Sequence, residues 1–170
     1  MRCDLKLERA SMKCSAAVGI AICAMIFPLD NSRAETTTIC GQTVNYSVAP
    51  PASDLPPELR SYHGIWMGDA QTIGLGNTGV MCVGFVIESI APDGTVSAKY
   101  IRGDSVKYAN GLTNFITPGV NPWQGKVSGN ALNFVSEDRK YSFELHVSGN
   151  EMRGLFVTPS GRGDVQMRRR

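Results

Sequence analysis

The 170-residue chain has little excess charge of either sign and no long apolar run. Its formal net charge is only +2, and it contains no low-complexity acidic or basic tract. It therefore lacks the electrostatic signature of a nucleic-acid-binding protein. With 42% apolar residues it can support a hydrophobic core, which excludes a fully disordered chain, and its composition also excludes collagen and a coiled coil. The length fits one globular domain.

The longest apolar run, residues 16–27, has 12 residues, whereas a membrane-spanning helix needs about 20. Basic residues precede the run, and Ser32-Arg33-Ala34 follows it as a small-x-small cleavage site. This pattern predicts a secretory signal peptide over residues 1–34 and a mature chain that begins at Glu35. Either Met1 or Met12 could start such a leader. A buried amphipathic helix is the alternative, but the run is apolar all round.

Cleavage at this site changes the composition of the chain. It removes five of seventeen basic residues and three of fifteen acidic ones, which leaves twelve of each and a formally neutral mature protein. It also leaves Cys40 and Cys82 as the only cysteines. In a secreted or periplasmic protein such a pair is expected to form a disulfide, here closing a loop of about forty residues. Free buried thiols and a metal site are the alternatives, although two distant cysteines do not supply four ligands.

The mature chain divides into two parts by its sequence pattern. Residues 35–61 form an N-terminal segment with a short strand at 43–48 and four prolines within residues 50–57, which suit a stiff linker, a surface strap or a ligand for a partner protein. From Tyr62 to Arg170, short runs of alternating apolar residues are separated by turn residues every eight to twelve positions. No helical periodicity appears in this part, so we expect an all-β domain without a transmembrane anchor.

Two hairpins repeat the sequence Val-Ser-Gly-Asn, at residues 127–130 and 147–150. Glycine and asparagine supply the positive φ angles that a tight hairpin turn needs. Successive hairpins indicate an antiparallel up-and-down sheet of about eight strands, and closing that sheet on itself removes its exposed edges. The sequence therefore predicts a small β-barrel over residues 62–170, with a two-sheet β-sandwich as the alternative.

The segment Gly64-Ile65-Trp66 resembles the G-x-W signature of lipocalins and related calycin barrels, in which the tryptophan closes the barrel floor. Residues 62–170 as a whole are similar to a bacterial secreted lipocalin-like domain. The resemblance implies that Arg168 or Arg169 packs over this tryptophan. It also implies a small, partly apolar ligand in or at the mouth of the barrel. Its candidate lining consists of inward-facing apolar and aromatic residues: Trp66, Val83, Phe85, Ile87, Tyr100, Phe134, Tyr141, Phe143 and Phe156.

No combination of residues in the sequence makes a convincing catalytic centre. Ser142, Glu144 and His146 share one face of a strand, but neighbours two apart project in parallel at roughly 6.5 to 7 Å, which suits a solvated face better than a triad. Glu137-Asp138 belongs to a polar turn, and His63 suits a cap at the end of the barrel. We therefore expect a noncatalytic protein without a cofactor or a metal site.

Three further motifs are expected to be structural. Residues 74–79 match G-x-G-x-x-G, but a strand follows them, so they predict a glycine-rich loop and a candidate lid rather than a dinucleotide site. Arg-Gly-Asp occurs at 102–104 and 162–164, in both cases at an expected turn. The three terminal arginines, 168–170, are expected to fray.

The expected function is the binding of a small apolar molecule by an exported barrel. The same aromatic residues would equally fill a solid core, because an eight-stranded barrel is barely wide enough for a ligand. A filled barrel that acts as a structural or protein-interaction module of the cell envelope, with an envelope or extracellular protein as its partner, is therefore the alternative. An enzyme of unknown type is the third class.

Overall fold

The computed structural model describes residues 34–48, 50–74, 77–159 and 161–170, without the side chains of 72–74 and 77. The predicted signal peptide, apart from Ala34, lies outside these residues. Within the described chain, no helix has the length and apolar character that crossing a membrane requires. The described chain contains one four-residue helix and eleven strands. Their bounds are β1 (Glu35–Ile39), β2 (Gln42–Tyr46), α1 (Pro57–Arg60), β3 (Gly64–Gly74), β4 (Asn77–Ile90), β5 (Thr95–Tyr108), β6 (Thr113–Phe115), β7 (Gly119–Ser128), β8 (Ala131–Val135), β9 (Ser142–Ser148), β10 (Glu151–Thr158) and β11 (Gly161–Arg169).

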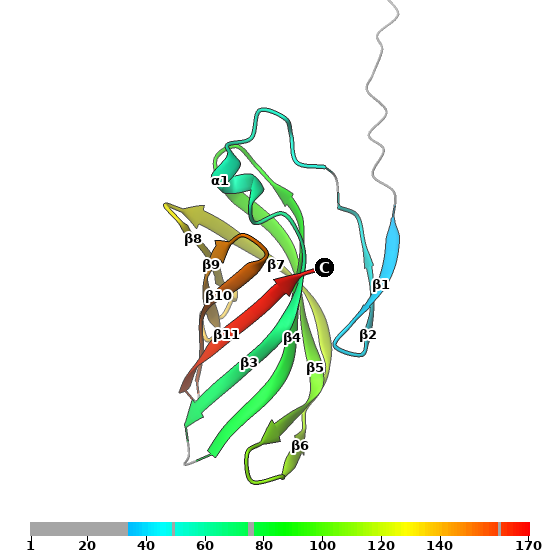
Figure 1. Cartoon of the computed structure of the whole chain (residues 1–170), viewed down its shortest axis with the longest axis vertical. Helices are drawn as coiled ribbons and strands as arrows, with labels where there is room; N and C mark the ends of the chain where they lie inside the picture. Colours follow the sequence, from blue (N-terminus) through cyan, green and yellow to red (C-terminus); the bar gives the residue numbers. More distant parts are fainter. Residues whose placement is uncertain (1–33, 49, 75–76, 160) are drawn as a thin grey trace, which may run out of the picture. The chain divides into compact units, whose positions relative to one another are not determined.

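Eight antiparallel strands close into a barrel, which confirms the predicted fold class. Each strand pairs with the next along the chain from β3 to β5 and from β7 to β11, and β11 pairs back with β3. The short strand β6 pairs with the end of β5 and precedes β7 on the same edge (Figure 1). A closed sheet of this kind leaves no long unpaired edge.

The two Val-Ser-Gly-Asn repeats form the predicted hairpins. Each is a two-residue turn, and Gly129 and Gly149 have φ angles of 60° and 59°. The expectation that the asparagines also adopt positive φ is wrong, because Asn130 and Asn150 are not among the residues with that conformation. Positive φ at the first central residue alone is the pattern of a type II′ turn, which needs glycine only there.

The barrel strands alternate side chains between the interior and the outer wall. Inward-facing residues of all eight strands make one core, in which Trp66, Phe85 and Phe134 are completely buried. A second, smaller core lies on the outer wall, where Val86 of β4 and Ile101 of β5 pack against the β1–β2 hairpin. The hairpin contributes Ile39 and Val44 to this outer core.

The disulfide between Cys40 and Cys82 is present, with the two Cα atoms 5.5 Å apart, as the sequence predicted. It joins the turn of the β1–β2 hairpin to the outer wall at β4. The hairpin also approaches β4 closely at Gly84, where an added Cβ atom would lie only 2.5 Å from a methyl carbon of Ile39. Strand β1 and helix α1 were not predicted. Each is only four or five residues long, too short to show a periodic pattern.

Three expectations about turns and ends are wrong. The glycine-rich segment is mostly strand, because the β3–β4 ladder continues to the pair Gly74 and Asn77. Both Arg-Gly-Asp motifs lie inside strands, residues 102–104 in β5 and 162–164 in β11. The last residue does not fray, since the Arg170 amide donates to the Ile65 carbonyl and its guanidinium to the Thr38 carbonyl. In each case long-range strand pairing, which local sequence does not show, decides the conformation.

Candidate functional site

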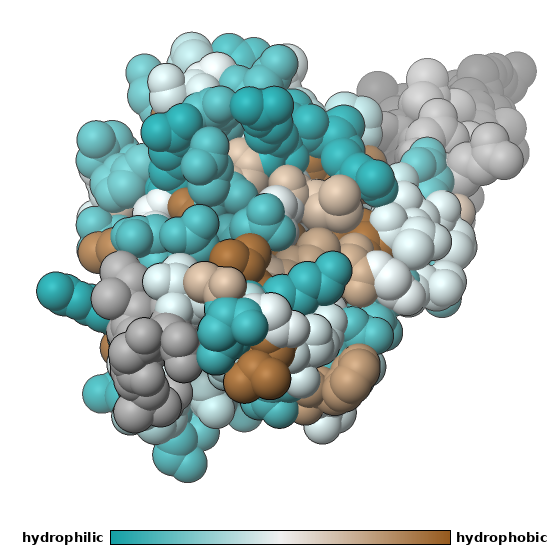
Figure 2. Space-filling model, turned by 60° about the horizontal axis from the view of Figure 1, so that its bottom comes forward, coloured by the Kyte–Doolittle hydropathy of each residue, from teal (hydrophilic) through white to brown (hydrophobic). Residues whose placement is uncertain are grey.

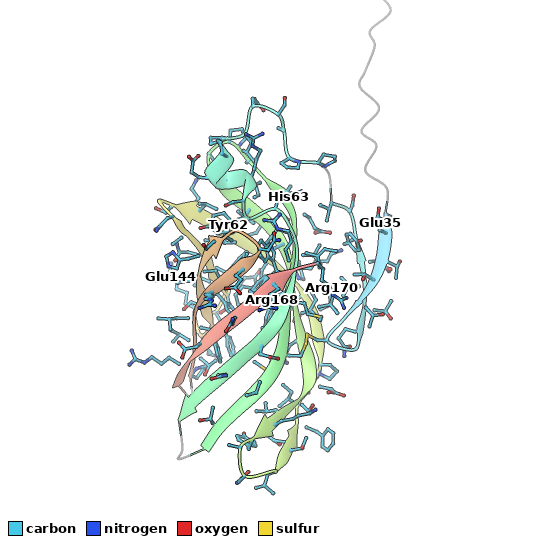
Figure 3. All side chains as sticks on the ribbon, in the orientation of Figure 1. Glu35, Tyr62, His63, Glu144, Arg168 and Arg170 are labelled. Carbon is cyan, nitrogen blue, oxygen red and sulfur yellow. A yellow bond between two sulfur atoms is a disulfide. The ribbon has the colours of Figure 1, made fainter. Side chains whose placement is uncertain are left out.

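The end of the barrel that carries α1 is closed by a hydrogen-bonded plug. The indole of Trp66 is completely buried and donates to the carbonyl of Tyr62 over 2.8 Å. The hydroxyl of Tyr62 in turn donates to the carbonyl of Asn130, in the β7–β8 turn, over 2.6 Å. Leu59 of α1 packs against the same core. Helix α1 and the residues after it therefore cover this end (Figures 1 and 3).

Arg169 completes the plug from the last strand. Its guanidinium carbon lies 4.5 Å from the centre of the Trp66 ring, which makes a cation–π contact. The same guanidinium donates to the carbonyls of His63 and Ser61. Burial lowers the pKa of Arg169 from its usual value. Of the two arginines proposed for this position, Arg169 is the one that packs over the tryptophan, and His63 lies at this end.

Six aromatic rings from six strands form a single cluster in the barrel interior. Phe85 stacks on Phe134 with ring centres 4.9 Å apart, and Phe143 meets Phe85 edge-on at 5.2 Å. Offset and edge-to-face contacts of this kind contribute about 0.5 to 1.5 kcal/mol each beyond the area that they bury. The aromatic cluster consists of Phe85, Tyr100, Trp123, Phe134, Phe143 and Phe156.

The aromatic cluster reaches solvent at the opposite end of the barrel, which we call the mouth and which carries the turns at 109–112 and 136–141. Trp123 is only partly buried, and Tyr141, beside the start of β9, is 41% exposed. Figure 2 views the molecule obliquely from this end and shows apolar surface in its middle, surrounded by polar side chains. The mouth therefore presents an apolar floor with a polar rim.

Tyr100 is the most unusual member of the cluster. Its side chain is only 8% exposed, yet no described residue forms a hydrogen bond with its hydroxyl. Burial raises the pKa of Tyr100 to about 12, and the nearby positive charge of Arg102 opposes that rise. The hydroxyl is therefore protonated at neutral pH and has a hydrogen to donate. The hydroxyl oxygen is not among the buried, unpartnered side-chain atoms of the described chain, so solvent reaches it. A ligand seated at the mouth would replace that solvent as its hydrogen-bond partner.

Arg102 lies on the same face of β5 as Tyr100, two residues closer to the mouth. Its Nε and Nη2 atoms donate to the carbonyl of Thr117, at 3.1 and 2.7 Å. Among the described residues no carboxylate lies within ion-pair distance of the guanidinium. A guanidinium has five N–H donors, so three of those on Arg102 have no partner within the described chain.

Five of the proposed lining residues belong to the aromatic cluster: Phe85, Tyr100, Phe134, Phe143 and Phe156. Trp66 instead lies in the plug, and Tyr141 lies on the rim of the mouth. Trp123 and Arg102 also belong to this region, and neither was predicted from the sequence. Both could have been found by alternation, since Trp123 and Val127 share one face of a strand and Arg102 follows Tyr100 by two positions.

Ser142, Glu144 and His146 lie on the outer wall of β9, as the alternation predicted. The Nδ1 of His146 donates to the carbonyl of Asn130 over 2.9 Å, and its Nε2 lies 3.3 Å from a carboxylate oxygen of Glu144. Both ring nitrogens therefore contact groups other than the hydroxyl of Ser142. A nucleophile and base that act together need a direct hydrogen bond, which this arrangement does not provide.

A separate groove of about 580 Å³ lies on the outer wall of β3 and β11. Its charged and amide side chains are exposed, whereas Met67 is half-buried against the outer core. The groove is lined by Met67, Gly68, Asp69, Gln71, Asp164, Gln166 and Arg168. Cross-strand pairing sets Asp69 beside Gln166 and Gln71 beside Asp164. The groove is outside the barrel and shares no residue with the aromatic cluster. Within the described residues no group of three or more potential metal ligands of the His, Cys, Asp or Glu type is found.

Comparisons with known proteins do not place the chain in a family. No protein-family model matches it, and no curated protein matches it. The similarity to lipocalins therefore rests on the closed eight-stranded barrel and on the contact between Trp66 and Arg169.

Proposed function

We propose that the protein binds a small, partly apolar molecule at the mouth of the barrel, without catalysing a reaction, and that it does so after export from the cytoplasm. The observation that carries the proposal is the aromatic cluster, which is sealed at the α1 end and reaches solvent at the mouth. Ligand sites in small barrels are mostly apolar hollows with a few polar groups that fix orientation. Tyr100 and Arg102 are such polar groups.

The neutral fluorescent probe N-phenyl-1-naphthylamine tests this proposal. We expect saturable binding with one site per chain, accompanied by quenching of Trp123, the cluster's only tryptophan. Substitution Trp123→Ala should weaken binding by about tenfold, because it removes a contact surface of the size typical of a binding hot spot. Leu155→Ser, on the outer wall, is the matched control and should leave the affinity unchanged.

The second candidate is a filled barrel that acts as a protein-interaction module of the cell envelope. It is favoured by an apolar patch on the outer wall, where Val135, Leu155 and Val157 are 53%, 46% and 47% exposed. Strand pairing gathers this patch, since Ser142 of β9 pairs with Val135 on one side and Val157 on the other. If the probe binding is abolished by Leu155→Ser and kept by Trp123→Ala, the outer patch is the binding surface and the mouth proposal fails.

A further inference from the structure

We propose that the ligand carries an anionic head group, and that Arg102 and the hydroxyl of Tyr100 bind it. This inference rests on the proposed function, because it assigns the chemistry of one end of a ligand whose apolar part lies on the aromatic cluster. The head-group class is a carboxylate, sulfonate or phosphate oxygen, which accepts hydrogen bonds and carries negative charge. The geometry that points to it is a set of unpartnered donors next to an apolar floor.

Two hydrogen-bond donors beside the apolar floor have no partner among the described residues. Tyr100 as a residue is 8% exposed, its hydroxyl oxygen is reached by solvent, and no described residue forms a hydrogen bond with that hydroxyl. The neighbouring Trp123, with its ring centre 5.4 Å from that of Tyr100, likewise has no partner for its indole N–H within the described chain. An indole N–H only donates, and a phenol can donate as well as accept. A ligand group that satisfies both must therefore offer acceptor atoms.

Arg102 brings a positive charge to the mouth. Arg102 and Tyr100 are close enough for the charge of the guanidinium to lower the pKa of the phenol. Because no described carboxylate neutralises Arg102, the guanidinium supplies an uncompensated positive charge beside the cluster. Hydrogen bonds between a guanidinium and an anionic oxygen are about twice as strong as neutral ones. The mouth therefore favours an acceptor with a negative charge over a neutral one.

Arg102 is held in place by the backbone of a neighbouring segment. Two of its N–H groups donate to the carbonyl of Thr117, between β6 and β7. These bonds fix the guanidinium in place and leave its other N–H groups for a ligand. A side chain already held by the protein loses little conformational freedom when it binds. Arg102 is thus both an anchor for the segment at Thr117 and a preorganised anion donor.

A matched pair of probes tests the head group. 1-Anilinonaphthalene-8-sulfonate and N-phenyl-1-naphthylamine share one aromatic framework, and only the first carries an anionic group. We expect Arg102→Gln and Tyr100→Phe each to weaken binding of the sulfonate by about tenfold, while binding of the neutral amine changes less than twofold. Arg153→Gln, on the outer wall of β10, changes the net charge equally and should affect neither probe.

The two possible failures are distinguishable. If wild-type protein binds the neutral amine at the mouth and Arg102→Gln weakens both probes equally, the anionic head group is refuted while ligand binding stands. If neither probe binds the wild-type protein, the proposed function fails and this inference fails with it. Binding of the neutral amine shows that each variant is folded. Should Arg102→Gln fail to fold, Arg102→Lys keeps the charge without the forked donors, and it should retain part of the preference for the sulfonate.

Discussion

The two ends of the barrel differ in where most of their polar side chains find hydrogen-bond partners. At the α1 end, Trp66, Tyr62 and Arg169 donate hydrogen bonds to backbone carbonyls of the same chain, although the Nε of Arg169 is buried without a partner among the described residues. At the mouth, the hydroxyl of Tyr100 and the indole N–H of Trp123 have no partner within the described residues, and solvent reaches both. Internal hydrogen bonds rigidify the α1 end, whereas solvent-accessible donors without an internal partner among the described residues make the mouth suited to binding. The comparison separates residues that hold the fold from residues that are available to a ligand.

The largest test of this comparison is truncation of the two tryptophans. We expect Trp66→Ala to lower the free energy of unfolding by about 3 to 5 kcal/mol, since it empties a completely buried site and removes the cation–π contact. Trp123→Ala should cost much less, because that side chain is partly exposed and its indole forms no hydrogen bond with the residues that the structure describes. Urea unfolding followed by circular dichroism measures both. Equal losses of unfolding free energy would show that the mouth contributes as much to stability as the α1 end.

Removal of the disulfide should have the next largest effect. Double substitution of Cys40 and Cys82 by serine opens the covalent loop between these residues, which are 42 positions apart in the sequence. On the chain-entropy account this change is expected to destabilise the protein by about 3 to 4 kcal/mol. Reductant added to the wild-type protein should give the same loss, and added to the double variant should give none. Affinity for the neutral probe should stay unchanged in the folded variant, because the bond lies on the outer wall. A change in affinity would connect the outer core to the mouth.

A smaller effect is expected from alkaline pH. Burial raises the pKa of Tyr100 to about 12 in the folded protein, while the unfolded residue ionises near 10. Above pH 10 the unfolded state therefore binds fewer protons than the folded state, so stability falls as pH rises toward 12, by about 1.4 kcal/mol per pH unit for this one group. Tyr100→Phe should flatten this fall in urea unfolding measured at pH 8.5, 10 and 11.

At neutral pH, Tyr100→Phe should lower the free energy of unfolding only a little. Tyr62→Phe should lower it by about 1 kcal/mol, because it loses the hydrogen bond to the carbonyl of Asn130.

The smallest effect is expected at the exposed β4–β5 turn of the α1 end. Asp93 accepts bonds from the amide and hydroxyl of Thr95 and from the ammonium of Lys126, and these lower its pKa to about 2. Because the folded pKa lies below the unfolded one, this contribution is present above about pH 4 and is lost as pH falls toward 2. Asp93→Asn should therefore lower the thermal midpoint slightly at pH 7 and by less at pH 2. An equal shift of the thermal midpoint at both pH values would show that the shape of the side chain, rather than its charge, causes the effect.

Alternation and turn chemistry made the barrel predictable. Tyr141 to Val147 alternates over seven residues, and glycine at 129 and 149 supplies the conformation that a two-residue turn demands. The motifs of residues 74–79, 102–104 and 162–164 were misplaced because their local composition favours turns. Their conformation is decided by hydrogen bonds to strands that are distant in sequence.

The site was harder to predict than the fold. Composition identified the aromatic residues that face inward, but alternation does not show how far along the barrel axis each of them lies. It could not show that Trp66 belongs to the plug while Trp123 lies near the mouth. Nor could it show that the hydroxyl of Tyr100 lacks a partner, since that depends on groups from several strands at once. Satisfaction of a buried donor is a property of three-dimensional packing and has no signature in a single strand.

The Cys40–Cys82 bond also determines how mechanical force would travel through the protein. For a molecule held by its N-terminal strand, tension leaves the backbone at Cys40 and enters the barrel at Cys82, in β4. The two cysteines are 42 positions apart in the sequence, so 41 residues lie between them, and these residues then carry no load. They include α1 and all of β3 with Trp66. A pull on the N-terminal side would thus be delivered to the barrel wall, and the covalent connection would bypass the chain through the plug at the α1 end.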